Sequence, residues 1–497
     1  MHANWETILW CDGQEIGIKE GKGMIYVHWI VLAAYTVIAV VAMITVLMEH
    51  RQPAKTIAWV LVLSFLPLVG IVLYFFFGRR TRKNHNIWKK SLDQLTKRSM
   101  IEFAEQKQLE LPEDNKKLIQ LFMNQNLALP FKNNTAEVYI SGYEFFPAVL
   151  AAISKAKHHI HIVSYIVDDD PLGHLLRDTL IDKAREGVEI RFLFDDVGSW
   201  KTPNSFFEQM REEGIEVHPF MPVRFPAFTG KVNYRNHRKI IVIDGKVGFI
   251  GGMNLAQRYV KGYKGRIWRD THVKICGAAV YGLQRAFLVD WFYADRTLIT
   301  DRKYYPEIKT KQPNNCLIQI VTSSPTSIWE ELEQGYIKIL LSAKQYVYME
   351  TPYFLPTEPM FFAMRTAALS GVDVRLMVSL ETDSKLVQMA SWSYLSQAVK
   401  AGVKVLCYKR GVNHSKLLVA DDNVATIGSA NIDFRSFENN FEANAFFYDK
   451  PMAQRIKNIF LTDEANSVPL ENIKEINQKT FLYRLWESVI RLLSPLL

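Results

Sequence analysis

Cysteine is scarce in this sequence, which has four cysteines among 497 residues. They lie far apart, and none belongs to a CxxC pair or to a zinc-binding spacing. The sequence therefore excludes a disulfide framework and is typical of a protein in a reducing compartment. It also lacks low-complexity segments, which excludes a largely disordered chain. The four positions are Cys11, Cys276, Cys316 and Cys407.

Neither sign of charge is in large excess. The net charge is +9, from 60 Lys and Arg against 51 Asp and Glu. A positive balance suits nucleic acid and anionic lipid equally, so charge alone does not separate these partners. No basic stretch interleaved with aromatic side chains surrounds the motifs at 236–245 and 413–422. This argues against a nucleic-acid partner.

Two apolar runs near the N-terminus, 24–48 and 56–77, contain almost no ionisable side chains. Each is long enough to cross a hydrocarbon core of roughly 30 Å. Residues 1–90 are therefore predicted to form a multi-pass anchor with two transmembrane helices. The flank at 78–90 has more Lys and Arg than the segment at 49–55, which predicts that residues after 90 are cytoplasmic.

One short motif, HxKxxxxD, occurs twice, in NHRKIIVIDG at 236–245 and in NHSKLLVADD at 413–422. Adding 177 to each position of the first copy gives its partner in the second. A small-residue pair and an asparagine follow both copies at the same distance. The first copy is His237, Lys239, Asp244, Gly251, Gly252 and Asn254, and the second is His414, Lys416, Asp421, Gly428, Ser429 and Asn431.

The apolar residues after each histidine predict a buried strand that carries the histidine and the lysine. Residues two apart on a strand point to the same face, so His237 should lie beside Lys239, and His414 beside Lys416. Asp244 has the opposite parity and begins a turn. We group Asp244 and Asp421 with the catalytic motif but expect them to serve mainly the turn.

An imidazole beside a fixed positive charge, present twice, suits attack on a phosphodiester. One histidine can form a phosphohistidine, and the other can protonate the leaving alkoxide and then activate the incoming hydroxyl. The two lysines offset the phosphate charge, and Asn254 and Asn431 can donate hydrogen bonds to its oxygens. This chemistry requires no metal and no other cofactor.

Several acidic residues compete for a role. The run at 168–170 has three aspartates before a proline and suggests a metal cluster, but consecutive carboxylates do not share a face. We favour a turn and a helix cap there, and a turn at Asp195 and Asp196.

The repeat extends upstream of both motifs, with a strand, a helix and a second strand before each histidine. The fold class is therefore predicted as α/β, with duplicated halves at 135–312 and 313–497 and a helical connector at 91–134. The C-terminal segment KTFLYRLWESVIRLLSPLL predicts an amphipathic helix that ends before Pro495. We favour packing of its apolar side on the second half, with the membrane surface as the alternative.

The two HxKxxxxD motifs with their GG or GS and Asn resemble the phospholipase D superfamily. The apolar anchor together with WRDTHV, ETPYFLPTEPM and NHSKLLVADDNVATIGSANIDFRSFENNFE resembles the bacterial cardiolipin synthases within it. The segment AQRYVKG after Leu255 departs from that family. The resemblance implies two α/β/α halves packed around one active site. It also implies that Asp270 and Glu442 orient the catalytic histidines, without indicating which carboxylate serves which histidine.

The resemblance further implies transfer of a phosphatidyl group from one phosphatidylglycerol to another, with cardiolipin and glycerol as products. We expect these lipids of a bacterial cell membrane as partners, and a homo-oligomer is possible. His237 is the expected nucleophile and His414 the expected acid and base, although the symmetric motifs allow exchanged roles. The alternatives are a membrane phospholipase D that hydrolyses phospholipid to phosphatidic acid, and a membrane-anchored nuclease or nucleic-acid-binding protein.

Overall fold

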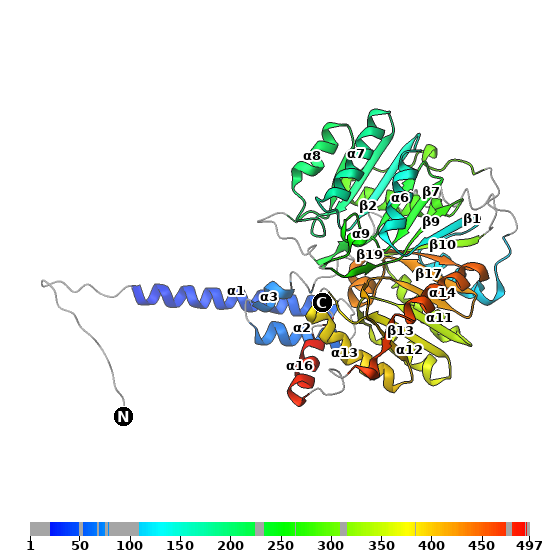
Figure 1. Ribbon diagram of the computed structural model, residues 1–497. Coiled ribbons are helices and arrows are strands. Elements are labelled where there is room, and N and C mark those ends of the chain that lie inside the picture. Colours follow the sequence, from blue (N-terminus) through cyan, green and yellow to red (C-terminus); the bar gives the residue numbers. More distant parts are fainter. Residues whose placement is uncertain are drawn as a thin grey trace, which may run out of the picture. The chain divides into compact units, whose positions relative to one another are not determined.

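The computed structural model describes residues 20–48, 53–66, 69–74, 78, 109–223, 233–263, 265–308, 316–382, 384–473, 480–492 and 494. Contacts divide the chain into two units, Met1–Arg79 and Arg80–Leu497 (Figure 1). The basic flank at 79–90 and most of the expected connector, up to residue 108, lie outside the described residues.

The N-terminal unit contains three described helices, α1 Glu20–Met48, α2 Pro53–Phe65 and α3 Val69–Leu73. Within the described residues, α1 alone is long and apolar enough to cross a membrane, over Tyr26–Met48. Within the second expected span, 56–77, the described residues form α2 and α3, and residues 67, 68 and 75–77 lie outside the described residues.

Helices α1 and α2 pack against each other through a small apolar cluster of Val46, Leu63 and Tyr74. The Tyr35 hydroxyl also donates a hydrogen bond to the Leu63 carbonyl, 3.1 Å away. Most other large side chains of α1 are exposed, including Trp29 and Ile30. Such a surface is suited to lipid contact rather than to water.

The second unit is built on one continuous sheet in which the two halves repeat the same strand order. From the junction outward, the first half has β1 Pro130–Tyr139, β9 His272–Cys276, β7 Val247–Gly251, β6 Ile240–Ile243, β2 His159–Ser164, β3 Glu189–Asp195 and β4 Glu216–Phe220. The second half has β10 Cys316–Ser323, β19 Asn440–Phe447, β17 Val424–Gly428, β16 Leu417–Ala420, β11 Tyr346–Glu350, β13 Asp373–Ser379, β14 Lys404–Tyr408 and the additional β20 Ser467–Pro469.

The halves join where β1 runs antiparallel to β10, with Pro130 opposite Gln319 and Phe131 opposite Ile318. Within each half, β2, β3 and β4, or β11, β13 and β14, are parallel neighbours. The predicted duplicated α/β fold is confirmed. Strand β1 begins inside the segment 91–134 that we expected to be a helical connector, after helix α5 Lys116–Asn126.

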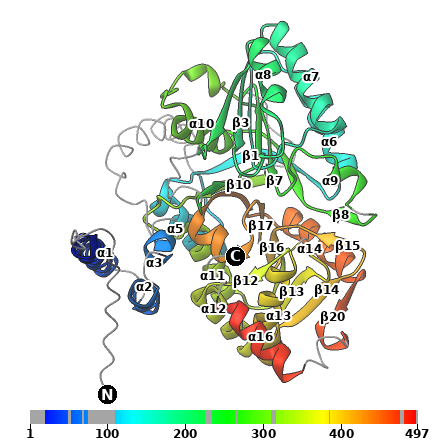
Figure 2. The ribbon, with the colours of Figure 1, turned by 90° about the vertical axis from the view of Figure 1, so that its left-hand side faces the viewer.

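Helices cover both faces of the sheet (Figure 2). Alternate strand residues of both halves pack on α10 Val280–Asp295 and α14 Lys450–Glu464, in one core shared by the halves. The opposite face of each half has its own core. In the first half it packs on α6 Gly142–Ile153, α7 Pro171–Arg185 and α8 Asn204–Glu212, and in the second on α11 Glu331–Ser342, α12 Glu358–Leu369 and α13 Lys385–Lys400.

Candidate active site

The two histidines lie in short links between strands, not on the strands that follow them. His237 and Lys239 lie between β5 Arg235–Asn236 and β6. His414 and Lys416 lie between β15 Gly411–Asn413 and β16. The expectation that the histidine and lysine belong to the buried strand is therefore wrong. The reason is that the chain before each histidine pairs with a strand of the other half.

Strand β5 pairs in parallel with β19 of the second half, and β15 with β8 Ile267–Arg269 of the first. The His237 amide donates to the Phe441 carbonyl at 2.9 Å, and the His414 amide donates to the Arg269 carbonyl at 2.7 Å. Each half thus fixes the backbone of the histidine from the other half.

The carboxylates cross between the halves in the same way. His237 Nδ1 is 3.0 Å from Glu442 Oε1, and His414 Nδ1 is 2.8 Å from Asp270 Oδ2. Both carboxylates are fully buried. The structure therefore pairs each histidine with the carboxylate of the opposite half, which fixes the ring orientation and leaves Nε2 as the reactive nitrogen.

The small pair after each motif makes room for these carboxylates. A Cβ atom at Gly252 would be 2.1 Å from Asp270 Oδ1, so only glycine fits there. At the equivalent position, Ser429 donates its hydroxyl hydrogen bond to Glu442 Oε2, and Ser436 donates to Oε1 at 2.9 Å. Glu442 is consequently held by more donors than Asp270.

Both carboxylates are ionised. Burial raises the pKa of Glu442, but the charge of His237 and its hydrogen bond outweigh burial and hold the pKa below its usual value. Burial likewise raises the pKa of Asp270, and the charges of Lys416 and His414 bring it below the ordinary range. Each histidine thus faces a fixed negative charge that stabilises an imidazolium.

The His237 side chain favours its neutral form. Burial lowers the pKa of His237, Glu442 raises it, and the charges of Lys239 and Lys416 lower it further. Burial and the charge of Lys416 also lower the pKa of Lys239 to about 7, although Glu442 opposes this. The protonation of His237 and Lys239 in the first half therefore depends on Glu442 and Lys416 of the second. A negatively charged phosphate beside Lys239 would favour the charged form of this lysine.

The lysines lie beside the histidines, as the spacing predicts. Lys239 Nζ donates to the His237 carbonyl at 2.5 Å. Lys416 Nζ is 2.8 Å from His414 Nδ1 and also donates to the His414 carbonyl.

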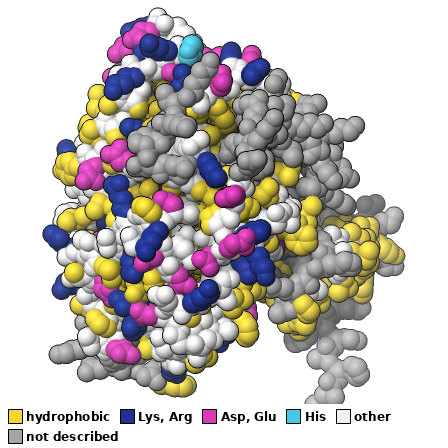
Figure 3. Space-filling model, turned by 90° about the vertical axis from the view of Figure 1, so that its right-hand side faces the viewer, with side chains coloured by type: hydrophobic (Ala, Val, Ile, Leu, Met, Phe, Trp, Pro, Cys, Tyr) yellow, Lys and Arg dark blue, Asp and Glu magenta, His cyan; other side chains and the backbone are white. Residues whose placement is uncertain are grey.

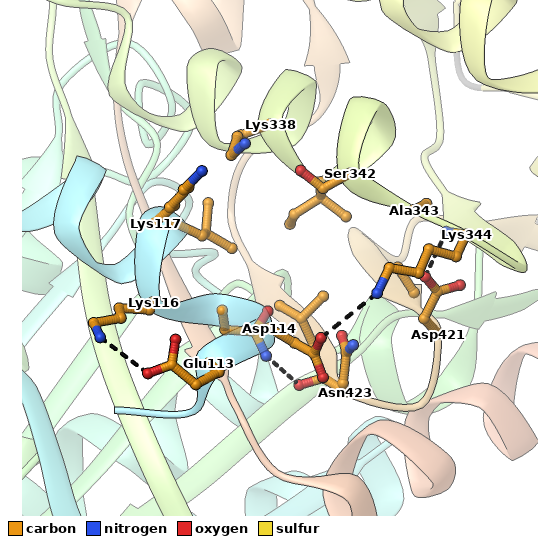
Figure 4. A pocket seen from close by; sticks show the side chains of 15 residues that line it. Glu113, Asp114, Lys116, Lys117, Lys338, Ser342, Ala343, Lys344, Asp421 and Asn423 are labelled. Carbon is orange, nitrogen blue, oxygen red and sulfur yellow. Dashed lines mark hydrogen bonds and ion pairs between the residues drawn. The ribbon is translucent and has the colours of Figure 1, made fainter. Parts of the chain in front are cut away.

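Asp244 and Asp421 lie at the far ends of β6 and β16 from the histidines. Asp244 accepts hydrogen bonds from the backbone amides of residues 157–159, and Asp421 from those of residues 344–346, all between 2.6 and 3.0 Å. Asp421 lines a surface pocket with Asp114 and Lys344, which form an ion pair there (Figure 4). These contacts anchor the start of β2 and β11, and neither aspartate contacts a catalytic histidine.

The two asparagines are engaged with protein groups. Asn254 Nδ2 donates to the Tyr259 hydroxyl at 2.6 Å, and its Oδ1 accepts from the Ile166 amide at 3.0 Å. Asn431 Nδ2 donates to Asp433 Oδ2 at 3.0 Å. Each Nδ2 has a second N–H, and a hydrogen bond from either asparagine to phosphate stays a prediction.

The acidic run at 168–170 forms the expected cap. Asp170 Oδ1 accepts from the Gly173 amide at the start of α7, and its Oδ2 accepts from the Gln257 amide. Asp168 forms an ion pair with Arg258 in helix α9 Arg258–Lys261, which is the segment that departs from the resembled family. Among the described residues, no group of three His, Cys, Asp or Glu side chains is arranged to hold a metal ion.

Sequence analysis missed two residues that hold the histidine links. Asp195 Oδ2 accepts from the Asn236 amide at 2.9 Å, and Ser379 Oγ accepts from the Asn413 amide at 2.7 Å. They end the equivalent strands β3 and β13. An alignment of the two halves pairs Asp195 with Ser379, so both halves have a polar residue at the end of this strand. Asp195 also accepts hydrogen bonds in the turn that we predicted.

It also missed the aromatic walls. The Tyr165 ring centroid is 5.0 Å from that of His237, and the Trp268 and Tyr353 centroids are 5.5 and 6.3 Å from that of His414. Tyr165 and Tyr353 both follow the first parallel strand of their half, but they are not at equivalent positions of the repeat, because Tyr165 aligns with Pro352.

Comparison with known proteins agrees with this geometry. Residues 149–276 and 336–464 match the family model described as cardiolipin synthase, PLD-like domain, and residues 37–79 match phospholipase D-nuclease N-terminal. The cardiolipin synthase of Listeria innocua and the major cardiolipin synthase of Bacillus subtilis are each 40% identical over 468 residues, covering 92% of this chain and 96% of the relative.

A likeness to a solved structure concerns the fold alone. The crystal structure of phosphatidylserine synthase from Haemophilus influenzae has a TM-score of 0.59 at 16% identity, covering 77% of this chain and 100% of that one. Given the full-length similarity and the two matched domains, the chain belongs to the cardiolipin synthase family of phospholipase D-like proteins.

Proposed function

We propose that this protein transfers a phosphatidyl group from one phosphatidylglycerol to the hydroxyl of a second, releasing glycerol and forming cardiolipin. The observation that carries the proposal is the pairing of each motif histidine with a carboxylate of the opposite half, in a chain of the cardiolipin synthase family. One centre then has two oriented imidazoles, one for each face of a transferred phosphorus.

In the first step, Nε2 of neutral His237 attacks the phosphorus of the donor lipid. The bond from phosphorus to the oxygen of the glycerol headgroup breaks, and His414 transfers its proton to that oxygen. Glycerol leaves, and the phosphatidyl group remains on His237. Lys239 and Lys416 offset the charge that builds on the phosphate oxygens, and Glu442 stabilises the positive charge on the His237 ring.

In the second step, neutral His414 takes a proton from the headgroup hydroxyl of the acceptor lipid. The acceptor oxygen attacks phosphorus as the bond from phosphorus to His237 breaks, which yields cardiolipin and restores both histidines. One phosphodiester replaces another, so the reaction needs no nucleotide. Asp270, which is ionised, stabilises the His414 imidazolium before the first step and after the second.

The site faces lipid rather than water in this proposal. Helix α1 is long and apolar enough to hold the chain in a bacterial membrane. We propose that the apolar segment at 56–77 returns across the bilayer, which leaves the catalytic unit on the cytoplasmic side. The basic composition of the flank at 78–90 supports this orientation.

The test is to incubate the purified full chain with vesicles that contain phosphatidylglycerol as the only anionic lipid, without nucleotide, and to identify lipid products by mass. Equal amounts of cardiolipin and glycerol are expected, and none from the His237→Ala or His414→Ala variants. Phosphatidic acid without cardiolipin would identify a hydrolase and refute the synthase proposal. The variant Asp169→Asn is a control, because Asp169 contacts His174 on the surface, away from both histidine links.

A further inference from the structure

The C-terminal helix α16 Phe481–Arg491 shows a broad apolar face to the surroundings. At 3.6 residues per turn, six side chains occupy one continuous arc of about 140° around this helix and the residue that follows it. All six are exposed, with Phe481 and Leu492 each at 78% and Trp486 at 56%. The six residues of this apolar face are Phe481, Leu482, Leu485, Trp486, Val489 and Leu492.

The opposite edge of α16 packs on helix α13 of the catalytic unit (Figures 1 and 2). Ile490 and Glu487 are buried there, and the Arg491 guanidinium carbon lies 4.4 Å from the centroid of the Tyr394 ring. The helix therefore packs on the second half as favoured, but the apolar set that we expected to make this contact points outward. An amphipathic helix of a water-soluble surface has the reverse orientation.

We propose that the apolar face of α16 inserts into the membrane interface and docks the catalytic unit on the lipid bilayer. Phe, Leu and Trp on one side of a helix, with arginine on the other, is the composition of helices that lie in the plane of a membrane. Tryptophan in particular is favoured at the boundary between hydrocarbon and headgroups. The same chain contains helix α1, which is long and apolar enough to cross a membrane.

The face of the catalytic unit that Figure 3 shows is more highly charged than this apolar face. On the face shown in Figure 3, Lys and Arg side chains alternate with Asp and Glu across the catalytic unit, as on an ordinary water-exposed surface. A contiguous apolar face on a helix with a polar inner edge marks an interaction site. Among the described residues, α16 is thus the element of the catalytic unit with the composition of a lipid-facing helix.

The helix that supports α16 is close to the active centre. Ser391 of α13 accepts a hydrogen bond from the Phe354 amide at 3.1 Å. The preceding residue, Tyr353, has its ring centroid 6.3 Å from that of His414. Docking through α16 therefore holds the His414 side of the site near the bilayer, where a lipid substrate would enter. This consequence depends on the proposed function, whereas the insertion of α16 does not.

The test places a nitroxide label on α16 of the full chain in phosphatidylcholine vesicles with and without phosphatidylglycerol. The label is attached at Leu485→Cys, in a background of Cys11→Ser and Cys276→Ser, since Cys316 and Cys407 are buried. The matched control is Leu175→Cys on α7, because Leu175 and Leu485 are both 51% exposed. In Figures 1 and 2, α7 and α16 lie at opposite ends of the catalytic unit.

We expect the label at 485 to collide with oxygen and to be shielded from a water-soluble nickel complex, and the label at 175 to show the reverse. Equal nickel accessibility at both positions would overturn the proposal, and so would spin–spin broadening at 485, which indicates a second copy as the occupant. Cardiolipin formation is measured in the same vesicles. A lipid-shielded label without turnover counts against the proposed function and not against the placement of α16.

Discussion

The most informative substitution is Glu442→Gln, which removes one negative charge and keeps the shape of the side chain. Glu442 is fully buried, and its two oxygens lie 3.0 and 3.2 Å from His237 Nδ1. Ser436 Oγ donates to the same carboxylate at 2.9 Å, and glutamine retains an oxygen that can accept such a bond. The substitution therefore removes the charge from the carboxylate–histidine contact, and it also replaces the oxygen that accepts from Ser429 by an amide donor.

The size of the effect follows from this contact. A hydrogen bond to a charged group contributes about 1.5–3 kcal/mol, and its loss leaves the imidazolium of the phosphohistidine step without its counter-charge. If the whole amount is lost in the transition state, kcat falls about 10- to 150-fold. The rate is measured as cardiolipin formed per chain in phosphatidylglycerol vesicles.

The pH profile separates this charge effect from a structural one. Glu442 raises the pKa of His237, which burial lowers, and it also raises the pKa of Lys239. Without this charge both pKa values fall. His237 must be neutral to act as the nucleophile, and Lys239 must be charged. The acidic and the alkaline limbs of the pH profile of kcat/KM therefore both move to lower pH.

The control is Glu331→Gln in the same half. Burial raises the pKa of Glu331 to about 8, so this carboxyl is mostly protonated at neutral pH and the substitution removes little charge. We expect its pH profile to match the wild type. If Glu442→Gln lowered kcat while both limbs stayed in place, the assignment of Glu442 as the counter-charge of His237 would be refuted.

Two further groups give predictions from their pKa values. Because burial lowers the pKa of Lys239 to about 7, kcat/KM should decline above about pH 7. The Lys239→Arg variant keeps its charge, so it should show no such decline, at the cost of a lower maximum. An unchanged alkaline limb in this variant contradicts the role of Lys239. Burial lowers the pKa of His272 to about 3, so its unfolded form takes up a proton below about pH 6.5 and the folded form does not. Acid therefore destabilises the fold through His272. The wild type should lose unfolding free energy between about pH 7.5 and 4.5, and this loss should be about 2–3 kcal/mol smaller in His272→Phe, whose ring would lie beside Phe145. The free energy is measured by denaturant unfolding at both pH values. His158→Gln, at an exposed position, should leave that loss unchanged, and an equal loss in the His272 variant contradicts the assignment.

Much of the catalytic fold follows from the sequence because the duplication makes each half a check on the other. The motif register and the buried strands were derivable from residue types and spacing. The turn role of Asp244 and Asp421 also followed from parity on the strand. Each of these aspartates accepts three backbone hydrogen bonds, which supports the turn role.

The pairing of histidines with carboxylates was not derivable. Glu442 follows His414 in sequence, and Asp270 follows His237, so spacing favours pairs within a half as readily as pairs across them. The exchange depends on β5 and β15 leaving their own halves to pair with β19 and β8. These strands are two and three residues long, too short for a periodic signal.

The orientation of α16 was missed for a related reason. Its amphipathic pattern shows that one side is apolar, but not whether protein or lipid covers that side.

The central claim is that the two halves form one catalytic centre, and counting the covalent intermediate tests it most directly. Phosphatidylglycerol labelled at phosphorus is mixed with the full chain, the reaction is stopped within a single turnover, and acid-labile label on histidine is counted per chain. One phosphatidyl group per chain, on His237, is expected. Its formation should be slowed in His414→Ala, which lacks the acid for the departing glycerol, and it should be absent in His237→Ala, with no cardiolipin from either variant. Two labelled histidines per chain, or turnover in either variant, would show two independent centres and contradict the account.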